Sequence, residues 1–249
     1  MSQALMAELR KGRRRHDAAV ILALALFVVL WAANMNMRTE DALASGYDAL
    51  IYGLPIMHTV VMPLGMAVLA SRRFDMETQG ENCKLLFTLQ EPDSLFFAKA
   101  AVLTAQNALL VGLELAGALL TGRAKGFTAS PRAGDWAWLA LGALAVNEML
   151  LMLFFALSVR GRTQLPALGG GVIASLLGVF SAYMPEHFML LMPWGWYVPL
   201  SPMRMDWDAQ TRICTFIPAG RSVPLLLCAA ALAMVFGALA RRSIGRREM

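Results

Sequence analysis

The sequence predicts an all-α integral membrane protein with about six transmembrane helices. Hydrophobic residues make up 58% of the 249 residues, and charged residues make up only 16%. A water-soluble domain of this length needs more surface charge than this to stay in solution. The apolar residues also form runs of about 20 residues, the length that a helix needs to cross a bilayer. We treat residues 1–249 as one transmembrane domain.

Six apolar runs are long enough to be spans, and they lie at 18–34, 48–70, 96–121, 136–158, 165–184 and 223–240. The first run follows the basic residues Arg13, Arg14 and Arg15, as the apolar part of a signal peptide does. The basic segment is long for a signal peptide, and the run continues through the bulky Trp31. We therefore interpret this run as a retained first helix, with cleavage as the alternative.

The basic residues predict the orientation of the spans. If six spans alternate, one side of the membrane receives Arg13 to Arg15, Arg72, Arg73, Lys84, Lys99, Arg160, Arg162, Arg241, Arg242, Arg246 and Arg247. An excess of Lys and Arg marks the cytoplasmic side, so both termini are expected there. The same distribution argues against a nucleic-acid partner, because the cations mark the ends of spans and form no phosphate-binding patch.

Two further segments flank the spans. Segment 1–17 places apolar residues near one face beside its basic run, which predicts an amphipathic helix on the inner membrane surface, with its arginines toward lipid headgroups. The alternative is a flexible basic tail. Segment 185–222 is apolar and aromatic, includes Trp194 and Trp196, and is interrupted by prolines. It predicts short re-entrant or interfacial helices on the outer side.

The cytoplasmic segment 72–95 carries a helix signal. Thr78 and Glu81 have the spacing of a capping box, which predicts a short helix beginning at Thr78 and ending before Pro92. This helix would present a mixed charged and apolar surface, made of Glu81, Lys84, Leu85, Leu86 and Leu89. Such a surface suits docking into a groove on a soluble partner or lying on the headgroups, and both interpretations stay open.

The chain lacks the common motifs of enzymes and cofactor sites. It has no P-loop, no zinc-binding H-E-x-x-H and no nucleophile elbow. The three cysteines, Cys83, Cys214 and Cys228, are far apart and are interpreted as apolar filler. The glycines at 169–171 lie in an apolar run and are interpreted as packing residues. We therefore expect no cofactor bound by this chain.

Three polar side chains fall inside predicted spans: Glu148 in the fourth, Glu114 in the third and His58 in the second. A carboxylate near the centre of a bilayer costs roughly 3 kcal/mol on insertion scales, so it usually faces a cavity or a partner. One interpretation is a polar lining that meets a cationic passenger. The other is structural, with each group protonated or hydrogen-bonded to Asn107, Asn147 or a neighbouring chain.

A resemblance joins these features. The pattern Glu77-x-x-Gly80-x-x-x-Lys84-Leu85-Leu86-Phe87-Thr88-Leu89, with Pro92 and Lys99 after it, resembles the ABC-2-type permeases of ABC transporters. In that family an acidic, glycine-containing segment after the second span forms a coupling helix. The outer motif Pro193-Trp194 with Pro199-Leu200-Ser201-Pro202 is similar to the branch that gives self-immunity to lantibiotics and other bacteriocins. One departure is Asp93 after Pro92, where relatives often carry a basic residue.

The resemblance implies a subunit of a multi-chain exporter in the bacterial cytoplasmic (inner) membrane. Two permease chains, identical or paralogous, would form the pathway, and two copies of a separate ABC ATPase would bind ATP and Mg. The residues that contact the ATPase would be Glu77, Thr78, Gly80, Glu81, Lys84, Leu85, Leu86 and Leu89. The expected passenger is a cationic antimicrobial peptide or a similar amphiphile, and the candidate pathway residues are Glu148, Glu114, His58, Trp194 and Trp196.

Two alternatives stay open. In the first, the chain is an ion-coupled secondary transporter in which Glu114, Glu148 and His58 relay protons. Such transporters often show paired Gly/Pro-interrupted spans in corresponding halves, and the sequence shows none. In the second, the chain belongs to an ABC-2 exporter of a drug or a lipid.

Overall fold

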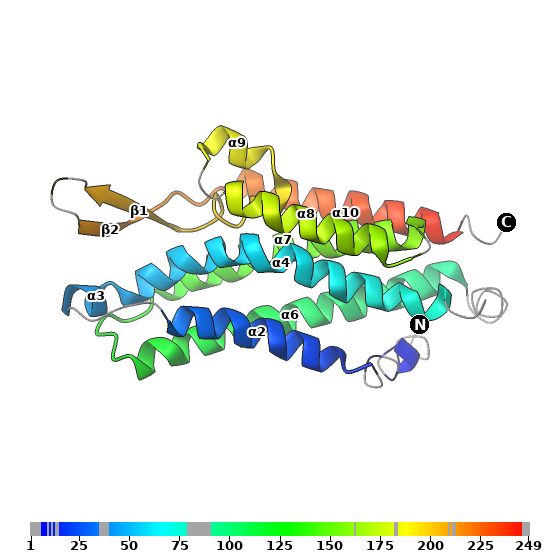
Figure 1. Ribbon diagram of the computed structural model, residues 1–249, viewed down its shortest axis with the longest axis horizontal. Coiled ribbons are helices and arrows are strands. Elements are labelled where there is room, and N and C mark those ends of the chain that lie inside the picture. Colours follow the sequence, from blue (N-terminus) through cyan, green and yellow to red (C-terminus); the bar gives the residue numbers. More distant parts are fainter. Residues whose placement is uncertain are drawn as a thin grey trace.

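The structure is a computed structural model that describes residues 6–8, 10, 12, 15–34, 40–78, 91–161, 163–181, 184–208, 210 and 213–245, with the backbone alone at 40, 41, 74–78, 186 and 213. Six long helices lie side by side in a bundle (Figure 1). They are α2 (Asp17–Ala33), α4 (Gly46–Thr78), α6 (Pro92–Ala124), α7 (Ala133–Gly161), α8 (Leu165–Ser181) and α10 (Val223–Gly245).

The helices confirm the predicted all-α membrane fold. Helices α4, α6, α7 and α10 are long and apolar enough to cross a membrane, and α2 and α8 are apolar helices of 17 residues each. Each predicted run overlaps one of these helices. Helices α4 and α6 extend beyond the predicted runs 48–70 and 96–121, so both continue as helix toward the segment that joins them.

Helix α4 packs closely against α8 although it contains Pro55 and Pro63. A proline has no N–H, so Pro63 leaves the carbonyl of Thr59 without its helical donor. Gly178 of α8 lies directly against this carbonyl, and Gly171 lies so close to α4 that an added Cβ would be 2.5 Å from that of Ala67. Of the three glycines predicted to pack, only Gly171 makes such an approach, since nothing lies within 4 Å of an added Cβ at Gly169.

The predicted outer segment, residues 185–222, is only partly helical where the structure describes it. Helix α9 (Glu186–Leu190) and the 3₁₀ turn η1 (Pro193–Gly195) come first, in the segment where short helices were predicted. Strands β1 (Met203–Asp208) and β2 (Ile213–Pro218) follow as an antiparallel hairpin, which was not predicted. In Figure 1 this hairpin projects past the end of the bundle, on the side where α3 (Glu40–Ala44) lies.

The opposite end of the bundle brings together the start of α2, the end of α4, the start of α6 and the end of α10 (Figure 1). Asp93 at the start of α6 binds Arg241 near the end of α10, with bonds of 2.7 and 2.6 Å from the guanidinium to the carboxylate. We call this end the coupling end, because α4 ends and α6 begins there, on either side of the predicted coupling residues in sequence. If successive spans alternate in direction, these four helix ends are expected on the same side of the membrane.

Candidate functional site

The predicted coupling residues lie at the junction of α4 and α6. Glu77 and Thr78 belong to α4, so Thr78 lies in a long helix, and the short helix predicted after it falls outside the described residues. The helix continues because no Gly or Pro interrupts residues 66 to 78, and helix formation propagates at little cost. Gly80, Glu81, Lys84, Leu85, Leu86 and Leu89 lie outside the described residues.

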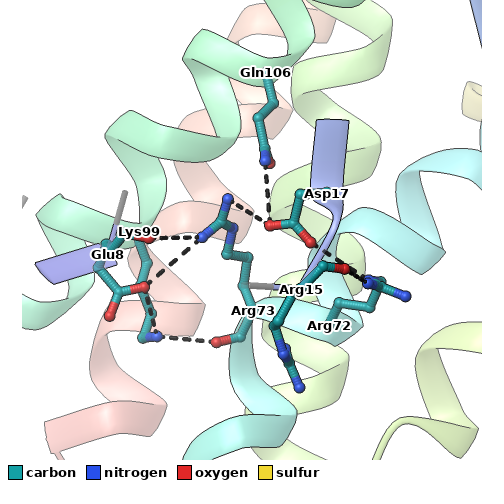
Figure 2. A network of polar contacts seen from close by, with 7 residues as sticks. All are labelled: Glu8, Arg15, Asp17, Arg72, Arg73, Lys99 and Gln106. Carbon is teal, nitrogen blue, oxygen red and sulfur yellow. Dashed lines mark hydrogen bonds and ion pairs between the residues drawn. The ribbon is translucent and has the colours of Figure 1, made fainter. Parts of the chain in front are cut away.

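A buried network of charged side chains lies directly beside this junction (Figure 2). We call it the N-terminal charge network, and it consists of Glu8, Arg15, Asp17, Arg72, Arg73, Lys99 and Gln106. The side chains of Glu8, Asp17, Arg73 and Lys99 are each no more than 6% exposed. Because ions are costly to bury singly, their mutual contacts must compensate for lost hydration.

The network centres on two cations and two acids. Lys99 of α6 places Nζ 3.2 Å from Glu8 Oε2, and it also donates to the carbonyl of Arg73 at 2.9 Å. Arg73 of α4 places one guanidinium nitrogen 2.8 Å from Asp17 Oδ2, and the other donates to the carbonyl of Glu8 at 3.2 Å. The N-terminal segment therefore joins the last turns of α4 to the first turns of α6.

The rim of the network adds weaker contacts. Arg72 lies 3.5 Å from Asp17 through Nε and donates to the carbonyl of Arg15, while Gln106 donates to Asp17 at 3.4 Å. Helix α4 ends before residues 79–90 and helix α6 begins after them. Both helices are held by the same two acids, Glu8 and Asp17. These contacts hold the end of α4, the start of α6 and the start of α2 together, because separating them would expose buried ions.

Sequence reasoning missed this network. It assigned the basic residues to orientation and to lipid headgroups, whereas Arg73 and Lys99 are buried against Glu8 and Asp17. The available signal was the presence of two acids, Glu8 and Asp17, within the basic N-terminal run. The structure also gives Asp93, the departure from the family pattern, a partner within the chain, namely Arg241.

Inside the bundle, the structure brings His58 and Glu114 together. His58 Nε2 of α4 lies 3.2 Å from Glu114 Oε2 of α6, and both side chains are no more than 3% exposed. This carboxylate is thus enclosed and paired within the chain. The pair supports the structural interpretation of these two residues, because a buried acid is stabilised by a basic partner.

Glu148 is in a different environment. Its carboxylate accepts hydrogen bonds from Thr104 Oγ1 at 2.7 Å and from Asn107 Nδ2 at 3.3 Å, both on α6. Neither partner is charged, and no ion pair with Glu148 occurs among the described residues. Glu148 therefore has donors that hold it in place but no cation that neutralises it.

Glu148 also lines a groove between α6, α7 and α10 with a volume of about 530 Å³. Apart from Thr104, Asn107 and Glu148, every lining residue is apolar: Ala108, Leu141, Leu144, Ala145, Leu226, Ala230, Ala233 and Met234. Volumes of this order accommodate small organic ligands. The groove opens on the outside of the bundle, where Leu141 and Met234 are 51% and 71% exposed.

The two predicted pathway tryptophans lie in η1 and just after it. Trp196 is 7% exposed, and its indole N–H donates to the carbonyl of Leu190 at 3.0 Å, which ties η1 to α9. Trp194 is partly buried beside the core. Neither lines the groove of Glu148.

No group of three potential metal ligands lies together in the part of the chain that the structure describes. The arrangement instead combines an apolar groove with one carboxylate inside a set of membrane-spanning helices, and a charged support beside the segment between α4 and α6.

Comparison with known proteins identifies the family. A family model described as ABC-2 family transporter protein matches residues 4–182, which is more than half of the chain. No curated protein matched. The members of this family are multi-pass membrane subunits that work with an ABC ATPase and are not themselves the ATPase. The chain therefore belongs to the ABC-2 transporter family, as a permease subunit of an ABC exporter.

Proposed function

We propose that this permease exports a cationic amphiphile from the membrane, such as an antimicrobial peptide of the lantibiotic or bacteriocin type. The observation that carries the proposal is the groove of Glu148, where one carboxylate stands on an otherwise apolar wall. An amphiphile that carries an amine or guanidinium matches both features. Its apolar part fits the groove and its cation meets Glu148, since charge pairing in a low-dielectric site is strong.

The contrast between the two intramembrane carboxylates supports this assignment. Glu114 is enclosed beside His58, so a passenger cation would have to displace a partner that is already present. Glu148 borders an open groove and is held by two neutral donors. Burial disfavours an ionised carboxylate, and these two donors offset part of that cost in favour of the form that attracts a cation.

Energy would come from the partner ATPase. We infer two ATPase copies and two permease chains, identical or paralogous, in the bacterial cytoplasmic membrane, with both termini on the cytoplasmic side. Residues 77–89 would contact the ATPase, and its movement would reach the helices through Arg73 and Lys99, which lie on either side of that segment. The positive charges near the coupling end support this orientation.

The ion-coupled transporter that the sequence left open would use the pair of His58 and Glu114, and the family assignment argues against it. A buried pair such as His58 and Glu114 has the composition of a proton-relay site. In that case, export would stop when the proton gradient is collapsed, and replacement of either residue would abolish transport. An ATP-driven exporter continues to work without the gradient.

The proposed binding site is tested with a permanently charged probe. Hexadecyltrimethylammonium is a cationic amphiphile, and hexadecyl sulfate is an anionic amphiphile with the same chain. We expect the purified permease in phosphatidylcholine nanodiscs to prefer the cation and Glu148→Gln to lose most of that preference. Asp206→Asn makes the same chemical change on the exposed hairpin and should keep the preference. If Glu148→Gln prefers the cation as strongly as the unmodified protein does, Glu148 is excluded as the cation site.

A further inference from the structure

Tyr197 of the outer segment contacts two polar residues inside the bundle, Asn147 and His58. Tyr197 follows η1 and is 3% exposed. Its hydroxyl donates to Asn147 Oδ1 at 2.6 Å, and its ring lies edge-on to His58 with 5.5 Å between the ring centroids. The outer segment thus reaches by a single side chain into the polar interior of the helices.

The hydrogen bonds that start at Tyr197 all run in one direction. A backbone carbonyl can only accept, so the bond of 3.0 Å from Asn107 Nδ2 to the carbonyl of Leu144 fixes how the Asn107 amide is turned. The same nitrogen donates to Glu148 at 3.3 Å. Asn107 Oδ1 is then free to accept from Asn147 Nδ2 at 3.0 Å. Asn147 Oδ1 in turn accepts from Tyr197.

This order has an electrostatic consequence for Glu148. The donors follow one another from Tyr197 through Asn147 and Asn107, and the last one points at the carboxylate. Each bond in such a chain polarises the next, which strengthens the final donor. The side chains of both asparagines belong to residues that are no more than 1% exposed, so water does not compete with these bonds.

We propose that Tyr197 is a positioning residue that acts through this chain to keep Glu148 ionised and able to hold a cation. The proposal rests on the function proposed above for the groove. Withdrawal of Tyr197 removes the first donor of the chain, and Glu148 then takes up a proton more readily and loses its attraction for the passenger. Movement of the outer segment is thereby linked to release.

Among the described residues, Glu148 is the one titratable group that lines the groove. The groove residues contributed by α6, α7 and α10 include no further acid, base, cysteine or tyrosine. At the Tyr197 end of these hydrogen bonds, the ring of Tyr197 packs against His58, which lies 3.2 Å from Glu114. These two residues face Tyr197 and not the groove.

The protonation of Glu148 can be followed directly in the full-length protein in lipid nanodiscs. A protonated carboxyl has an infrared C=O band, and its loss in Glu148→Gln identifies the band of this residue. Tyr197→Phe should raise the pH at which the band is half-maximal by roughly half a unit, since it removes one bond from the chain. Asn147→Leu interrupts the series of hydrogen bonds one bond closer to the carboxylate. It should raise the pH of the half-maximal band at least as much as Tyr197→Phe does.

Tyr47→Phe is the matched control. Tyr47 is also buried, at 5% exposure, but its ring packs against Phe127 and Trp136 and takes no part in the chain. Its removal should leave the midpoint unchanged. A midpoint that stays the same in both Tyr197→Phe and Asn147→Leu would overturn the proposal. A raised midpoint in these two variants would support the series of hydrogen bonds from Tyr197 to Glu148. If Glu148→Gln nevertheless binds hexadecyltrimethylammonium normally, the proposed function is contradicted.

Discussion

The ion pair between Lys99 and Glu8 offers a quantitative test of the N-terminal charge network. Lys99 is 1% exposed and lies 3.2 Å from Glu8 Oε2. The substitution Lys99→Met keeps the length and apolar stem of the side chain and removes the ammonium group, which also donates to the carbonyl of Arg73. The Glu8 carboxylate then remains buried without the ammonium group beside it.

The size of the effect follows from the burial. Removing one partner of a buried ion pair typically costs about 3–5 kcal/mol, because a charge is left in a low-dielectric site. Arg73, whose NH1 is 4.0 Å from Glu8 Oε2, offsets part of this cost. We expect Lys99→Met to lose about 3 kcal/mol of unfolding free energy. The double variant Glu8→Gln with Lys99→Met should lose about 2 kcal/mol less than the sum of the single changes.

The assay is equilibrium unfolding of the purified protein in mixed micelles, with all four members of the double-mutant cycle. Asp93→Asn with Arg241→Met provides the comparison, since that pair joins α6 to α10 but is about half exposed at both side chains. Solvent screens exposed pairs, so this second cycle should show little coupling. Additive losses in the Glu8 and Lys99 cycle would refute the view that the N-terminal segment holds α4 and α6 together.

Two further predictions concern helix packing and ATPase binding. Gly178→Ala should destabilise the protein by about 1–3 kcal/mol, because the new methyl group meets the carbonyl of Thr59, whereas Gly169→Ala has open space and should be neutral in thermal unfolding. Scrambling residues 77–89 should abolish co-purification of the ABC ATPase without changing the unfolding midpoint, and retention of the ATPase by the scrambled protein would contradict the proposed contact.

The positions of the helices could be predicted because lipid imposes a simple rule. Each span must be helical and apolar over about 20 residues, since unpaired backbone groups are too costly in hydrocarbon. The six predicted runs therefore coincide with α2, α4, α6, α7, α8 and α10. Their exact ends could not be predicted, because α4 continues as helix past Arg73 into polar sequence.

The hairpin in the outer segment could not be found by the same rule. Met203, Met205 and Trp207 alternate with charged residues, which is the period of a strand, but proline and aromatic residues around them favoured an interfacial interpretation. Pairing with β2, a non-local contact, decides the structure. Local composition does not contain that information.

The candidate site was predicted as a set of residues and not as a set of contacts. Composition alone indicated that Glu114, Glu148 and His58 were unusual within spans. It could not indicate that His58 would pair with Glu114 or that Tyr197 would reach Asn147, because these contacts join residues far apart in the chain. The difference between a paired carboxylate and one on an open groove appears only when the helices are assembled.

We propose that this permease exports cationic amphiphiles with energy from ATP that its partner hydrolyses. The most direct test is ATP-dependent removal of hexadecyltrimethylammonium from proteoliposomes that contain the permease with its co-purified ATPase. The account predicts removal that needs ATP, continues after the proton gradient is collapsed and is lost in Glu148→Gln. Removal of the probe that is unaffected by Glu148→Gln, or that stops when the gradient is collapsed, would contradict it.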